Sequence, residues 1–144
     1  MLTSALLALL GACGGPATGP EESLREWVQH GVEAAEARER RKLVGMVSPA
    51  YADARGNGRD GIERLLRAYF VRMHTVELVT SIEEVAIIGD SAAEVMLKVA
   101  MAGTHDGVFG FSADAYRFLL EVEHDGDDWQ LISARWGQWG KELK

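Results

Sequence analysis

The side chains that most often carry catalysis or hold metal ions are scattered along this sequence. His30, His74, His105 and His124 lack the short His, Cys, Asp or Glu spacing that is typical of a zinc site. No serine stands in the context of a nucleophile elbow. The glycines around Asn57 follow no predicted strand, so they do not indicate a phosphate-binding loop. We therefore expect no metal and no cofactor.

Cys13 is the only cysteine, so an intrachain disulfide is excluded. It follows an apolar stretch, residues 2–10, that is too short to span a bilayer. The four residues that end at Cys13, Leu-Gly-Ala-Cys, resemble the lipobox of bacterial lipoproteins. The resemblance implies that residues 1–12 are a signal peptide and that the Cys13 thiol carries a diacylglycerol after cleavage. No Lys or Arg precedes the apolar stretch, whereas the usual leader begins with a positive charge. A start upstream of Met1 would explain this departure.

This resemblance further implies a location in the bacterial cell envelope. Several acyl chains would make the membrane a durable partner through Cys13, as one chain would not. Gly14, and not an aspartate, follows the cysteine, as in enteric-type lipoproteins that are sorted to the outer membrane. The resemblance therefore implies a location on the periplasmic face of the outer membrane. Residues 13–19 then comprise the lipidated cysteine and a flexible tether rich in glycine. Residues 20–144 form the folded domain.

Composition excludes one class of partner. The 144 residues carry a net charge of -7, and 47% of them are hydrophobic. This is the composition of one ordinary globular domain. Nucleic-acid binding requires a basic face that offsets phosphates, so we expect no nucleic acid as a partner.

The first half of the domain has the periodicity of helices. A helix is predicted from Pro20, with Glu21 and Glu22 in its first turn, where the helix dipole favours acidic residues. A short helical stretch around residues 43–47 and a glycine-containing loop, residues 50–61, come next. A further helix is predicted over residues 61–73 from its apolar stripe.

After His74 the period changes from about 3.6 to 2 residues, which indicates strands. Strands are predicted over residues 76–88 and 92–102, and a loop is predicted over residues 103–115. The last two apolar stretches, residues 116–123 and 129–136, flank a turn that contains Asp-Gly, which is a strong hairpin signal. We expect this hairpin to form the centre of a curved sheet.

Helices followed by an antiparallel meander predict an α+β domain, with about four curved strands packed on three N-terminal helices. This order resembles the cone-shaped nuclear transport factor 2-like fold, which includes the SnoaL-like and ketosteroid isomerase-like proteins. The resemblance is carried by Tyr-Ala-Asp-Ala-Arg-Gly at residues 51–56, by the helix that follows, and by Asp-Asp-Trp-Gln-Leu-Ile-Ser at residues 127–133. Small envelope lipoproteins of unassigned role with this fold are what the whole chain resembles most.

Resemblance to the ketosteroid isomerase branch implies one enzymatic alternative. Asp53 matches the position of the general base in that branch. The oxyanion donors do not match, because Gly31 or a neighbour stands where a tyrosine is expected and Phe118 or a neighbour where an acid is expected. Asp53 is also the residue type that bonds its own backbone in a turn, and this is the interpretation we favour.

Three functions follow as expectations. The first is an envelope lipoprotein that binds a small apolar ligand or an envelope protein without catalysis. The second is an isomerase- or dehydratase-like enzyme with Asp53 as general base. The third is an interaction protein that forms a homodimer through its sheet face. If the cone is hollow, the residues expected to line it are Tyr51, Tyr69, Met73, Met96, Phe118 and Trp136.

Overall fold

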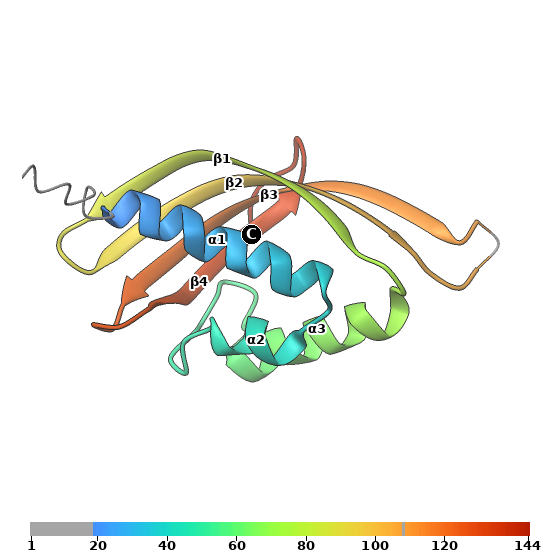
Figure 1. The fold of residues 1–144 in the computed structure, drawn as a ribbon, viewed down its shortest axis with the longest axis horizontal. Helices are drawn as coiled ribbons and strands as arrows, with labels where there is room; N and C mark the ends of the chain where they lie inside the picture. The colour runs from blue at the N-terminus through green and yellow to red at the C-terminus, as the bar shows by residue number, and fades with distance from the viewer. Residues whose placement is uncertain (1–18, 108) are drawn as a thin grey trace, which may run out of the picture.

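A computed structural model describes residues 19–107 and 109–144 of the chain. Three helices come first: α1 (Pro20–Glu36), α2 (Arg40–Gly45) and α3 (Arg59–Arg72). Four strands follow: β1 (Glu77–Ile88), β2 (Ala92–Thr104), β3 (Phe111–His124) and β4 (Trp129–Gln138). The four strands form one curved sheet that arches over the helices (Figure 1). The predicted α+β class and the order of its elements are therefore confirmed.

The strands form an antiparallel meander in the order β1-β2-β3-β4. A bulge between Ile82 and Glu84 interrupts the pairing of β1 with β2. A second irregularity lies between Glu121 and Val122. Bulges increase the local twist, which helps a sheet to curve around its helices.

Two features of the sheet differ from expectation. The final hairpin is present, with Phe118 opposite Trp136, but β4 is an edge strand, so the hairpin is not the centre of the sheet. The stretch predicted as a loop, residues 103–115, is strand at both of its ends, because β2 continues to Thr104 and β3 begins at Phe111. The ladder extends because cross-strand pairs such as Gly103 with Ser112 continue its hydrogen bonds past residues of low β-propensity.

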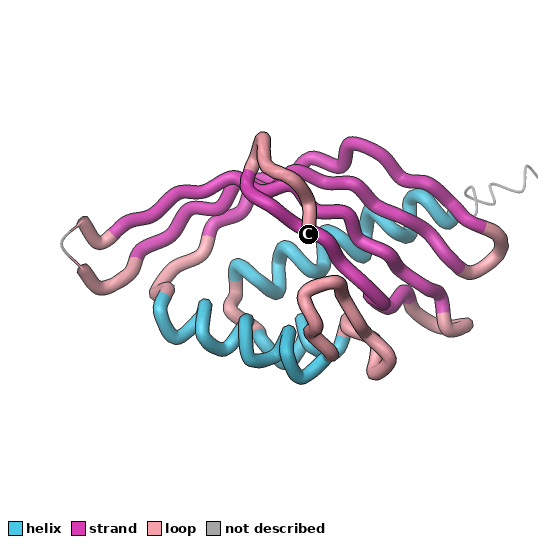
Figure 2. The backbone as a smooth tube through the Cα atoms, turned by 180° about the vertical axis from the view of Figure 1, so that it is seen from behind, coloured by secondary structure: helices cyan, strands magenta, loops and turns pink. Residues whose placement is uncertain are grey.

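Helix α1 lies across the concave face of the sheet, with α2 and α3 below it (Figures 1 and 2). Its residues Leu24 and Val28 are buried against Val95, Leu97 and other apolar residues of the sheet. Leu24, Val95 and Val122 have no exposed surface. Within the described ranges, none of the helices has the length and apolar character that crossing a bilayer requires.

Candidate functional site

The loop between α2 and α3 is held against the free edge of β4. Val47 forms a parallel bridge with Leu131, and the Ser48 N–H donates to the Leu131 carbonyl at 2.9 Å. The Ala52 N–H donates to the Ile132 carbonyl at 3.1 Å. Because these bonds continue the sheet, Tyr51 and Asp53 occupy fixed positions beside the last strand.

Asp53 is surrounded by donors from its own loop. Its Oδ2 accepts a hydrogen bond from the Tyr51 hydroxyl at 2.8 Å. Its Oδ1 accepts from the Arg55 and Asn57 main-chain N–H groups, both at 2.9 Å, and the Asn57 side-chain amide donates to both oxygens. This is the arrangement of a turn aspartate that organises its own backbone.

The same bonds set the protonation of the pair. Burial alone would raise the pKa of Asp53, but the hydrogen bonds from Asn57, Tyr51 and Arg55 outweigh it and lower the pKa below its usual value. Burial, and then the bond to Asp53, raises the pKa of the Tyr51 hydroxyl far above its ordinary value. The carboxylate is therefore a weak base, and the tyrosine hydroxyl already has an acceptor.

Arg55 connects this loop to the end of the chain. Its guanidinium lies 4.2 Å from the centroid of the Trp136 ring, a cation–π contact. Its Nη2 donates to the Trp136 carbonyl at 2.8 Å and its Nε to the Lys144 carbonyl at 3.1 Å. Main-chain bonds also join Trp136 and Lys144, so the final residues return along β4 (Figure 2).

The residues expected to line the cone divide into two groups and one outlier. Tyr51 is 3% exposed and packs with Ala134, and Trp136 packs partly against the same cluster and stacks with Phe118 at 6.4 Å between ring centroids. Met73 is 2% exposed and belongs to a separate cluster with Tyr69 and residues near the end of α3. Tyr51 and Met73 therefore fill the interior instead of lining an open cavity.

Met96 does not face that interior, so its expected position is wrong. It pairs with Leu119, whereas its neighbours Val95 and Leu97 are buried on the concave side. Side chains alternate across a strand, so Met96 lies on the outer, convex face with Lys98.

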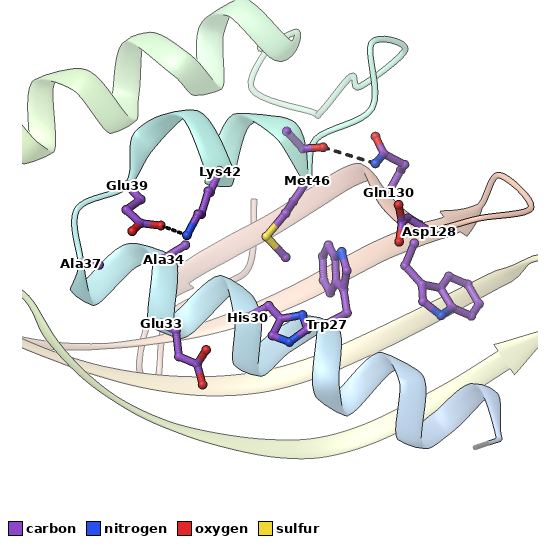
Figure 3. A pocket seen from close by; sticks show the side chains of 12 residues that line it. Trp27, His30, Glu33, Ala34, Ala37, Glu39, Lys42, Met46, Asp128 and Gln130 are labelled. Carbon is purple, nitrogen blue, oxygen red and sulfur yellow. Dashed lines mark hydrogen bonds and ion pairs between the residues drawn. The ribbon is translucent and has the colours of Figure 1, made fainter. Parts of the chain in front are cut away.

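A groove that was not predicted lies between α1, α2 and the β3–β4 turn (Figure 3). Its volume is about 560 Å³. The apolar part is formed mainly by Trp27, Ala34, Met46 and Trp129, and the polar rim is formed by His30, Glu33, Glu39, Lys42, Asp128 and Gln130. The Trp27 Nε1 is buried and has no hydrogen-bond partner among the described residues, so this side chain contributes packing surface.

One sequence signal could have indicated this groove. Trp27, His30 and Ala34 follow each other at helical spacings of three and four, which makes a second stripe on α1 beside the buried one. The partners that close the groove, Met46 and Trp129, come from distant parts of the chain. No cluster of three or more metal-ligating side chains occurs in residues 19–107 and 109–144. Cys13 lies outside the described residues.

Comparison with known proteins supports the fold. No known family profile matches the sequence, and no curated protein is significantly similar to it. Many solved structures share its fold. A proposed scytalone dehydratase from Novosphingobium aromaticivorans superposes with a TM-score of 0.72 at 10% identity, covering 85% of this chain and 89% of that one.

Two further structures are similar. A proposed dehydratase of the nuclear transport factor 2-like family from Streptomyces avermitilis gives a TM-score of 0.70 at 13% identity, covering 82% of this chain and 95% of that one. A ketosteroid isomerase-like protein from Erwinia carotovora gives 0.67 at 12% identity, covering 83% and 95%. The predicted nuclear transport factor 2-like fold is thus confirmed, and at these identities the likeness concerns the fold alone.

Proposed function

We propose that this chain is a bacterial envelope lipoprotein, anchored through Cys13, whose nuclear transport factor 2-like domain binds a ligand or a partner protein without transforming it. The proposal that the domain is not catalytic is supported mainly by the hydrogen bonding and protonation of Asp53. Its carboxylate accepts bonds from Tyr51, Arg55 and Asn57, and its pKa is lowered. A general base needs a pKa near the working pH and access to the substrate proton.

The positions of the implied oxyanion donors support the same proposal. Gly31 lies beside the methyl group of Met46, and Phe118 stacks with Trp136. Neither position offers a hydrogen-bond donor from its side chain. Removal of one such donor typically costs a factor of about 100 to 1,000 in rate, so a base without them would be a poor catalyst.

Replacing Asp53 with asparagine tests the enzymatic alternative. We expect neither the parent protein nor Asp53→Asn to turn over a ketosteroid or scytalone, the two substrates suggested by the names of the structural neighbours. Turnover by the parent that is lost in Asp53→Asn, while the variant remains folded by circular dichroism, would establish the enzyme instead.

The same variant has a predicted effect on stability. Asparagine replaces a charged acceptor with a neutral one, so we expect a loss of about 1–2 kcal/mol in the free energy of unfolding at pH 7. The folded-state pKa of Asp53 lies below the reference value of 3.8, so its contribution is present above that pH and is lost as the pH falls through the folded-state value. Urea unfolding should therefore show a difference at pH 7 that shrinks as the pH falls below 3.8. A difference that stays the same as the pH falls through this range would contradict this role.

Cys13→Ser tests the anchor. Thioether attachment requires sulfur, so we expect the variant to lose incorporation of a labelled fatty acid and to leave the membrane fraction. Gly14→Asp is the matched variant: it should keep the label but move the protein from the outer to the inner membrane. Mass spectrometry that finds an unmodified Cys13 in the mature parent protein would contradict the proposal.

A homodimer is the second candidate, because the outer face of the sheet carries an apolar depression. Val79 is 74% exposed there, beside Ala100 and Ala115 on the neighbouring strands. A buried charge opposes association, so we expect Val79→Glu to convert a concentration-dependent dimer into a monomer in sedimentation experiments. A parent protein that is monomeric at all concentrations would exclude this candidate.

A further inference from the structure

The groove between α1, α2 and the β3–β4 turn has the size of a small-molecule site and an uneven charge. Its volume of about 560 Å³ lies within the range of ligand-binding clefts. The groove is lined by three carboxylates, those of Glu33, Glu39 and Asp128, and by one ammonium group, that of Lys42. Lys42 already pairs with Glu39. The remaining negative charge of the groove therefore belongs to Glu33 and Asp128.

Neither Glu33 nor Asp128 forms an ion pair with any other described residue. Glu33 accepts one hydrogen bond, from the Gln29 side chain at 3.2 Å. The turn that carries Asp128 is also anionic, because the Asp128 and Asp127 N–H groups lower the pKa of Asp125. Both carboxylates are thus available to a cationic ligand.

These two carboxylates lie at opposite ends of the groove (Figure 3). The Trp129 Nε1 donates to the Ser23 hydroxyl at 3.2 Å, which places the β3–β4 turn beside the first half of α1. Glu33 is ten residues further along the same helix, a distance of about 15 Å at 1.5 Å per residue. The ring of Trp27 and the thioether of Met46 lie between the two ends.

We propose that this groove binds a linear aliphatic polyamine, a chain with an ammonium group at each end. One ammonium would pair with Glu33 and the other with Asp128, while the methylene chain would lie over Trp27 and Met46. Indole faces attract ammonium groups and pack well against methylenes. The inference rests on the proposed function, since it names the ligand class of a non-catalytic binding domain.

The test is isothermal titration of the full chain, in mild detergent, with 1,8-diaminooctane. We expect it to bind at least tenfold more tightly than 1,8-octanediol, which has the same length without charge. Octylamine, with one ammonium, should be intermediate, and 1,3-diaminopropane, which is too short to reach both carboxylates, should bind no better than octylamine. Absence of diamine binding at millimolar concentration, or equal affinity for the diol, would overturn the proposal.

Matched charge variants locate the site. Glu33→Gln and Asp128→Asn should each weaken diamine binding about threefold to fivefold, the size expected for one exposed ion pair. Glu22→Gln removes the same charge from α1 outside the groove and should leave the affinity unchanged. An equal loss in Glu22→Gln would show general attraction to an acidic protein and overturn the assignment. Fatty-acid labelling and turnover are measured on the same preparation. If that protein carries the label, shows no turnover and does not bind the diamine, the polyamine proposal is refuted while the proposed function stands.

Discussion

Gly103→Ala is expected to destabilise the domain by about 3 kcal/mol or more, or to prevent folding, because a methyl group at this position has no room. A Cβ built on Gly103 would lie 2.2 Å from the Thr75 carbonyl oxygen and 2.6 Å from the Met73 methyl carbon. The methionine could move. The carbonyl is part of a main chain that is fixed nearby, where the His74 N–H donates to the Thr104 carbonyl at 2.7 Å.

The matched control is Gly45→Ala, at the last residue of α2. Nothing lies within 4 Å of a Cβ at this position. Alanine favours helices over glycine by up to about 1 kcal/mol, so this variant should be as stable as the parent or slightly more stable. Thermal and urea unfolding of both variants provide the comparison. A Gly103→Ala protein that unfolds at the parent's midpoint would show that the contact between β2 and the segment after α3 is not as close as described.

Leu24→Ala is expected to cost about 2–5 kcal/mol, because it leaves a cavity where α1 meets the sheet. Leu24 has no exposed surface and packs in the cluster that contains Val95, Val122 and Trp129. The helix itself tolerates alanine well, so the loss should come from packing. Urea unfolding, analysed by linear extrapolation, measures the effect.

Leu65→Ala makes the same substitution in α3, where Leu65 is 49% exposed. We expect it to cost about 1 kcal/mol or less, since much less apolar surface leaves water at that position. If the two leucine variants lost equal stability, α1 would not be the helix that closes the main core.

These stability effects bear on function because the polyamine groove shares α1 with the core. Leu24 and Val28 face the sheet, while Trp27 and Ala34 line the groove. One helix thus has two uses, and a change at Glu33 can alter binding without opening the core. Beside Asp53, by contrast, Tyr51 is buried, and the Arg55 guanidinium bonds to the Trp136 and Lys144 carbonyls. The proposed ligand is assigned to the groove because apolar surface and carboxylates outside ion pairs occur there together.

Local patterns in the sequence were enough to determine the order of the elements. The start of α1 at Pro20, the change to a period of two after His74 and the turn containing Asp125 and Gly126 are all set by neighbouring residues. The turn role favoured for Asp53 also agrees with its bonds to Arg55 and Asn57, which are close in sequence. Such features could be predicted because helix stripes, strand alternation and turn residues act over a few positions.

Tertiary structure alone decided the features that join distant segments. The contact of Arg55 with Trp136 and Lys144 spans more than 80 residues, and the groove brings Trp27 and Met46 to Asp128. The extension of β2 and β3 through residues predicted as a loop depends on a partner strand, which outweighs weak local propensity. Charged residues of α1 look the same in sequence whether they face water or a groove, because only the path of the whole chain places a second surface opposite them.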